Sequence, residues 1–236
     1  MMRLKIYKAA LCCSLLCFLS TAALAQSTNR AQLISEIDSL HSQLKAKEAE
    51  LLSPSEEDKT AFADFLKQPE TGLIRLLPRE KFKGKLSIRG DGTFYSFAQL
   101  SQEYGHGSDI GLEKEKLRVG FAGVSYGFLL MLGDVPLEDV DLETAGVPFL
   151  SNYVAPSTMH AATEEKRRKI EGVQANGLTY RGEIPAVVKK TYIVRSIEYR
   201  SSDTLVAFRI VRQDTDGSLI ILWKMLKKFP VPQLID

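Results

Sequence analysis

Apolar residues recur at helical spacing along residues 29–52. The spacings are four, three, four and seven residues, and charged residues fill the other faces; the apolar positions are Leu33, Ile37, Leu40, Leu44 and Leu51. A seam this narrow predicts a helix and is typical of coiled coils. Because the seam covers only three heptads, two interpretations stay open: an amphipathic helix packed on its own domain, or a helix through which chains self-associate.

A second helix is predicted to begin at Ser53. Ser53 is a suitable N-cap, Pro54 stands at the first helical position, and Glu56 completes a capping box. Its apolar face consists of Phe62, Phe65 and Leu66. The helix is expected to end before Gly72.

Beyond Gly72 the apolar period changes from about four residues to two, which is typical of half-buried β-strands. Residues 85–97 alternate around a Gly-Asp-Gly turn and predict a hairpin. Residues 116–132 alternate on either side of Ala122 and Gly123 and predict a second hairpin. Residues 134–158 contain three prolines and predict a long excursion, after which 158–171 predicts a helix.

Three β-rich runs follow, over 187–199, 205–213 and 219–229, separated by turn-forming clusters of Ser, Asp and Gly. Apolar side chains occupy both faces of the last run: Leu219, Ile221, Trp223 and Met225 on one, Ile220, Leu222 and Leu226 on the other. A strand of this kind needs cover on both faces. Either helices lie on the sheet, or one face forms a groove for something apolar.

These elements predict an α+β fold. We expect a signal peptide over 1–25, a helical segment over 26–70, and an antiparallel β-sheet domain over 73–236 with long C-terminal strands and one inserted helix. The composition, 44% hydrophobic and 25% charged, is that of an ordinary globular protein.

The first 25 residues have the organisation of a bacterial secretory signal. Arg3, Lys5 and Lys8 form a positive n-region, an apolar run follows, and residues 23–25 (Ala-Leu-Ala) offer small side chains to a signal peptidase. The run is shorter than the roughly 20 apolar residues of a membrane span. We therefore expect cleavage before Gln26 and a periplasmic or secreted protein without a transmembrane span.

Cleavage changes both the cysteine content and the charge. It removes Cys12, Cys13 and Cys17, so the mature chain has no cysteine, and it leaves 28 basic against 29 acidic residues. A net charge of −1 argues against a nucleic-acid partner. Without cysteine or a pair of histidines in ligand spacing, we expect no metal site. No cofactor motif is present, so we expect no cofactor.

The densest polar cluster lies over residues 103–111. It brings Glu103, His106, Ser108 and Asp109 together among glycines, a set that contains a base, a hydroxyl and two carboxylates. The cluster lacks the G-x-S-x-G pattern of a nucleophile elbow. A surface loop between strands is the interpretation that we favour, and these four residues are the candidates if the protein is an enzyme.

Basic residues are dense on the C-terminal strands, while five acids lie within 134–143. The basic residues are Lys189, Lys190, Arg195, Arg200, Arg209, Arg212, Lys224, Lys227 and Lys228. This distribution predicts a charge-polarised surface that an anionic polymer or lipid headgroup could bind. The same residues also serve to protect edge strands from aggregation.

Taken together, the patterns favour an exported, non-enzymatic binding or interaction protein that holds an apolar ligand or a protein partner. Two other classes stay open. One is a secreted hydrolase centred on the 103–111 loop, and the other is an assembly protein that forms homo-oligomers through residues 29–52.

Overall fold

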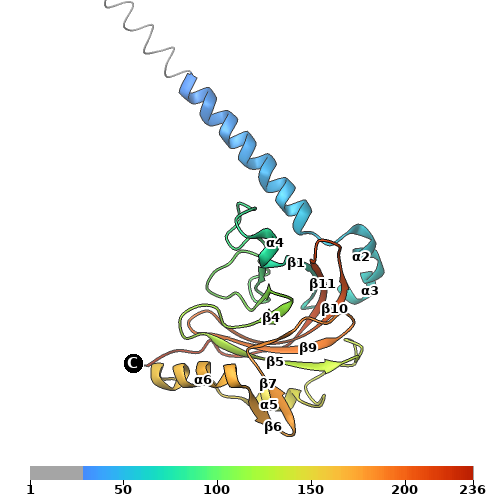
Figure 1. The fold of residues 1–236 in the computed structure, drawn as a ribbon, viewed down its shortest axis with the longest axis vertical. Helices are drawn as coiled ribbons and strands as arrows, with labels where there is room; N and C mark the ends of the chain where they lie inside the picture. Colours follow the sequence, from blue (N-terminus) through green and yellow to red (C-terminus); the bar gives the residue numbers. More distant parts are fainter. Residues whose placement is uncertain (1–28, 236) are drawn as a thin grey trace, which may run out of the picture. The chain divides into compact units, whose positions relative to one another are not determined.

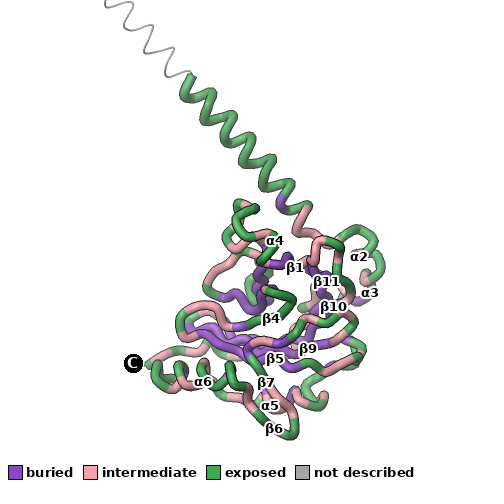
Figure 2. Tube along the Cα trace, in the orientation of Figure 1, coloured by how far each residue is buried: buried purple, intermediate pink, exposed green. Residues whose placement is uncertain are grey.

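The computed structural model describes residues 29–235. The predicted signal peptide and the three cysteines lie outside the described residues. The chain divides into two compact units, Met1–Ala49 and Glu50–Asp236. Residues 29–52 are helical throughout, as the spacing of their apolar residues predicts, and residues 29–47 are exposed along their length (Figure 2).

Two short helices follow this long helix, α2 (Glu56–Ala61) and α3 (Ala63–Leu66). A capping box is present but lies two residues later than predicted. The N-cap of α2 is Ser55, whose hydroxyl accepts from the backbone N–H of Asp58. The Asp58 carboxylate in turn accepts from the backbone N–H of Ser55. The reason is that Ser53 still belongs to the end of the preceding helix, where its N–H donates to the carbonyl of Glu50 (3.3 Å).

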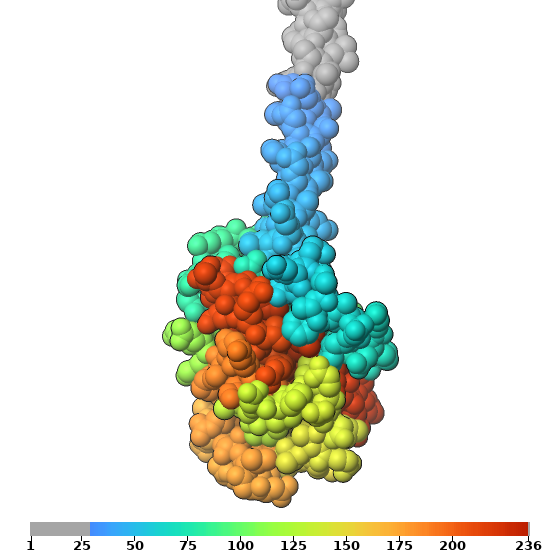
Figure 3. Space-filling view, turned by 90° about the vertical axis from the view of Figure 1, so that its right-hand side faces the viewer, coloured from blue at the N-terminus to red at the C-terminus, as the bar shows by residue number. Residues whose placement is uncertain are grey.

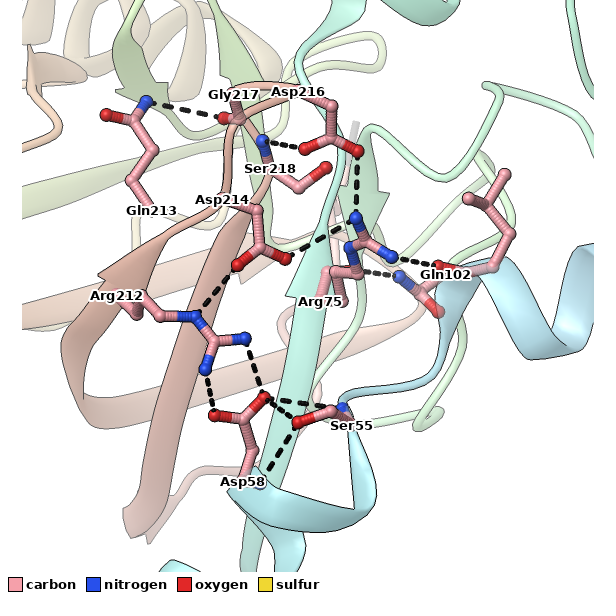
Figure 4. Close-up of polar contacts among 11 residues, drawn as sticks. Ser55, Asp58, Arg75, Gln102, Arg212, Gln213, Asp214, Asp216, Gly217 and Ser218 are labelled. Carbon is pink, nitrogen blue, oxygen red and sulfur yellow. Dashed lines mark hydrogen bonds and ion pairs between the residues drawn. The ribbon is translucent and has the colours of Figure 1, made fainter.

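Asp58 also joins α2 to the β-sheet, because its carboxylate forms a two-pronged ion pair with Arg212 (2.6 and 2.8 Å). Arg212 also forms an ion pair with Asp214. Both Asp214 and Asp216 form ion pairs with Arg75, which lies on the strand Thr71–Leu76 (Figure 4). In the space-filling view the helices α2 and α3 lie against the end of the last β-hairpin (Figure 3). A chain of alternating charges therefore fixes these helices to the domain.

The main sheet has five antiparallel strands in the order β1-β11-β10-β9-β5 (Figure 1). Their bounds are β1 (Thr71–Leu76), β5 (Tyr126–Gly133), β9 (Thr191–Glu198), β10 (Ser202–Gln213) and β11 (Leu219–Lys228). The three long C-terminal strands are confirmed, with starts a few residues later than predicted for β9 and earlier for β10. The predicted turn at 214–218 is also confirmed, since Gly217 N–H donates to the Asp214 carbonyl (2.9 Å).

A smaller antiparallel sheet has four strands in the order β2-β3-β4-β8, and β6 pairs with β7 in a hairpin of its own. The bounds are β2 (Phe94–Tyr95), β3 (Ile110–Glu113), β4 (Lys116–Arg118), β6 (Val173–Ala175), β7 (Leu178–Tyr180) and β8 (Glu183–Pro185). The remaining helices are α4 (Arg79–Phe82), α5 (Val147–Asn152) and α6 (Met159–Glu171). Helix α6 confirms the predicted helix, with Thr158 as its N-cap and Gly172 after its end.

The main sheet is covered on both faces, as the two-sided apolar pattern of β11 predicts. Ile221 and Trp223 pack with residues of the small sheet, including Ile110 and Leu117. On the other face, Leu222 belongs to a second core formed with α5, α6 and residues of the 134–158 excursion. The domain therefore has three layers around two cores, and neither face of β11 is left open for a ligand.

Both predicted hairpins are wrong. Residues 85–89 form bends rather than a strand, because the Asp91 carboxylate accepts three backbone N–H groups, from Gly84, Lys85 and Leu86, that a partner strand would otherwise bond. The runs on either side of Ala122-Gly123 become β4 and β5, but β4 pairs with β3 and β8 whereas β5 pairs with β9. The turn after β4 carries the chain from one sheet to the other.

Candidate ligand-binding groove

The structure separates the candidate residues of the 103–111 loop. Ser108 and Asp109 are buried, whereas Glu103 and His106 are exposed. Asp109 faces the core, where its carboxylate accepts from the backbone N–H of Phe97 (2.6 Å), and the Ser108 hydroxyl accepts from Gly105 N–H (3.0 Å). Within residues 29–235, no hydrogen bond joins the His106 imidazole to Ser108, Asp109 or Glu103. The loop therefore does not form a nucleophile–base pair.

Three buried side chains of this region are titratable: Asp109 in the loop, Glu198 on β9 and Lys169 on α6. Burial raises the pKa of Asp109 to about 6 and the pKa of Glu198 to about 8, and the negative charge of Asp109 adds to the shift of Glu198. Burial lowers the pKa of Lys169, on α6, to about 8. At neutral pH the carboxyl of Glu198 is therefore mostly protonated, and the ammonium of Lys169 is mostly charged.

Lys169 connects this buried group to a cavity at the surface of the domain. Its stem lies against Gly182, where an added Cβ would come within 2.8 Å of the lysine Cδ. Its ammonium donates to the carbonyls of Val119 (2.7 Å) and Gly120 (3.4 Å). Because Gly182 has no side chain, the lysine can reach the strand-connecting turn after β4 and line the cavity beside it.

This cavity, which we call the groove, has a volume of about 910 Å³ and lies between α6, the β6–β7 hairpin and the edge of the small sheet formed by β4 and β8. Figure 1 shows α6, β7 and β5 at the same end of the domain. Small-molecule sites commonly occupy about 300–1,000 Å³. The groove is therefore large enough to hold a single ligand of moderate size.

The groove is lined by five cations and one acid. The cations are Lys116, Arg118, Lys166, Lys169 and Arg181, and the acid is Glu183. Glu183 pairs with Lys116 (2.6 Å) and with Arg118 (3.2 Å), and Arg118 also pairs with Glu113. The positive charge of the groove thus exceeds what its own carboxylate can neutralise.

Apolar side chains form much of the remaining lining. They are Val119, Phe121, Leu130, Met131, Ile170, Leu178 and Ile184. Two of them face solvent to an unusual extent: Ile170 is 75% exposed and Met131 is 46% exposed. Exposed apolar side chains and cations therefore lie side by side in the lining of the groove.

The sequence does not reveal this groove, and part of the basic surface predicted on the C-terminal strands is buried or paired with acids. Arg195 is buried, and Arg209, Arg212 and Lys228 are paired with the acids Asp134, Asp58 and Glu70. The excursion carrying five acids folds back onto these strands, so the opposite charges meet each other. The signal that could have indicated the groove is Ile170, an isoleucine four residues after Lys166 in a polar helical run.

Comparison with protein-family models, curated proteins and solved structures gave no match. Across residues 29–235, no group of three or more His, Cys, Asp or Glu side chains is placed to hold a metal ion. Among the helices that the structure describes, none is long and apolar enough to cross a membrane.

Proposed function

We propose that this chain is an exported, non-enzymatic binding protein whose groove holds a small ligand with an apolar portion. The observation that carries the proposal is the groove itself: a cavity of about 910 Å³ that combines an excess of cations with exposed apolar side chains. A ligand that covers the exposed Ile170 would gain stability, since apolar surface gains about 25 cal/mol per Å² on burial.

The arrangement of the 103–111 loop supports binding rather than hydrolysis. A secreted hydrolase centred there would need a base within hydrogen-bond reach of a nucleophile. The exposed His106 and the buried Asp109 face different environments, and the Ser108 hydroxyl is used within the loop. Export of the protein rests on the signal-like residues 1–25, with the periplasm as the proposed compartment.

Native mass spectrometry of the full chain expressed in an exporting host tests this proposal. We expect the mature protein to begin at Gln26 and to carry extra mass that disappears on denaturation. We expect the Thr179→Trp variant to carry no such extra mass, because its indole occupies space in the groove. Thr163→Trp, on an exposed position of α6 outside the groove, is the matched control and should retain it. A bare wild-type protein that also takes up no added amphiphile would contradict the proposal.

A second property, self-association through residues 29–52, is favoured by the exposure of the apolar seam. Large side chains with 45–62% exposure follow the four-three-four spacing: Leu33, Ile37, Leu40 and Leu44. This period of 3.5 residues is the one that keeps a seam facing a second helix. Ile37 and Leu40 then occupy the a and d positions that favour parallel dimers, so we propose a second copy of this chain as the partner.

Sedimentation velocity over a range of concentrations tests the self-association. We expect the wild type to form a dimer as its concentration rises. We expect Ile37→Asn combined with Leu40→Asn to stay monomeric, because the two asparagines replace half of the four exposed apolar residues of the seam. Asp38→Asn combined with Lys45→Asn changes only the polar faces and should leave the dimer intact. A wild type that sediments as a monomer at every concentration would exclude this property.

A further inference from the structure

In the part of the chain that the structure describes, three of the groove's cations have no carboxylate partner. Lys166 donates to the carbonyl of Gly123 (2.5 Å), and Lys169 donates to the two carbonyls of the turn after β4. Within residues 29–235 the guanidinium of Arg181 forms no hydrogen bond or ion pair with another side chain. Glu198, the acid whose charge would attract Lys169, is mostly protonated at neutral pH. Lys166, Lys169 and Arg181 therefore keep a combined charge of about +3.

The end of helix α6 explains only part of this charge. Cations in the last turn of a helix interact favourably with its dipole, which accounts for Lys169 and for Arg168, whose guanidinium is paired with Glu165. Arg181 comes from a different segment, between β7 and β8, and its stem lies beside Gly172, where an added Cβ would be 3.3 Å from the arginine Cγ. Lys166 and Arg118 repel Lys169 and contribute to the lowering of its pKa. Like charges brought together in this way favour an anion between them.

The exposed apolar side chains lie next to these cations. Ile170 directly follows Lys169 on α6, and Met131 belongs to β5, against which α6 packs. Leu178 adds a further apolar group from β7. The lining of the groove therefore offers both positive charge and hydrocarbon.

We infer that the ligand is a single-chain amphiphile with one anionic head group, a long-chain carboxylate, whose head contacts Lys166, Lys169 and Arg181 and whose chain lies along Ile170 and Met131. This inference rests on the proposed function of the groove. A cavity of about 910 Å³ suits one small molecule, whereas a folded protein partner needs roughly 800 Å² of surface on each side. The positive charge of the three cations favours the binding of an anionic head group over a neutral or cationic one.

Calorimetric titration of the full protein with dodecanoate, dodecanol and dodecyltrimethylammonium tests the inference. We expect dodecanoate to bind with one site and at least roughly tenfold more tightly than the other two, because hydrogen bonds to charged groups contribute about 1.5–3 kcal/mol. Lys166→Gln combined with Arg181→Gln should weaken dodecanoate by roughly tenfold or more and leave dodecanol unchanged. Arg167→Gln, on the same helix but outside the groove, should bind dodecanoate as the wild type does.

The outcomes separate the ligand class from the site. If dodecanol or the cation binds as tightly as dodecanoate and Thr179→Trp abolishes that binding, the groove is a site but the anionic class is wrong. If an acidic peptide binds and dodecanoate does not, the class is also wrong. If none of these ligands binds, or if Thr179→Trp leaves binding unchanged, the proposed function of the groove fails together with the inference.

Discussion

Replacing Asp203 with alanine is expected to lower the free energy of unfolding by about 3–5 kcal/mol, the largest effect of any exchange considered for this protein. Arg195 is 1% exposed, and its Nε and one terminal nitrogen donate to the two Asp203 oxygens (2.5 and 2.8 Å). The other terminal nitrogen donates to the carbonyl of Leu150 (2.6 Å), and the guanidinium lies 3.2 Å from the ring centroid of Phe229. Removing the carboxylate leaves a buried cation without its counter-charge.

Urea denaturation at pH 7 measures this loss. Asp64→Ala, which removes an acid from an exposed pair with Lys67, is the matched control and should cost less than about 1 kcal/mol. Arg195→Met combined with Asp203→Leu should recover most of the stability, since apolar replacement of a whole buried pair is commonly neutral. A single Asp203→Ala variant within about 1 kcal/mol of the wild type would show that Arg195 is not buried as the structure has it.

The second large effect is a loss of stability as the pH rises from 5 to 8. The folded-state pKa of Glu198 is raised from 4.5 to about 8, so the folded state binds a proton more tightly than the unfolded state throughout this range. Its stabilising contribution is full below pH 4.5 and is lost as the pH rises through 8. At 1.36 kcal/mol per pKa unit, the free energy of unfolding should fall by about 3 kcal/mol between pH 5 and 8 from this group alone.

Glu198→Gln tests the assignment, because the amide is neutral at every pH. We expect the variant to lose most of the decline between pH 5 and 8, retaining the part that comes from Asp109, whose pKa is raised to about 6. Lys169 acts in the opposite sense and only at higher pH, between about 8 and its ordinary value of 10.5. Glu103→Gln, on an exposed side chain, should keep the wild-type profile. An unchanged profile in Glu198→Gln would refute the burial of this carboxyl.

The fold class could be predicted because its elements depend on local pattern. The apolar residues of 29–52 and of the long C-terminal strands repeat with a period that is visible within each segment, and Gly172 marks the end of the helix over 158–171. The two hairpins failed because the alternation of a strand does not say which segment pairs with it. Leu117 alternates as a hairpin strand would, yet its strand pairs with residues 110–113, which precede it, and with the distant residues 183–185, rather than with the run that follows it. At residues 85–89, the side chain of Asp91 outcompetes a partner strand for the backbone N–H groups.

The groove could not be predicted for a related reason. Its cations come from β4, α6 and the segment before β8, which are not adjacent in the sequence. Nothing local distinguishes Arg181, whose guanidinium pairs with no acid among the described residues, from Arg209, which is paired with Asp134 (2.6 Å). The 103–111 cluster was prominent only because its polar residues are adjacent in sequence, whereas the fold turns Asp109 inward and His106 outward.

The most direct test of the central proposal is to locate a bound amphiphile chemically. The full protein would be irradiated with a dodecanoate that carries a diazirine near the end of its chain, and the labelled peptides identified by mass spectrometry. We predict labelling at Met131 and within residues 170–185, suppressed by excess dodecanoate and by Thr179→Trp. Labelling confined to the long helix or to the 103–111 loop, or labelling that excess dodecanoate does not suppress, would contradict the assignment of the groove as the ligand site.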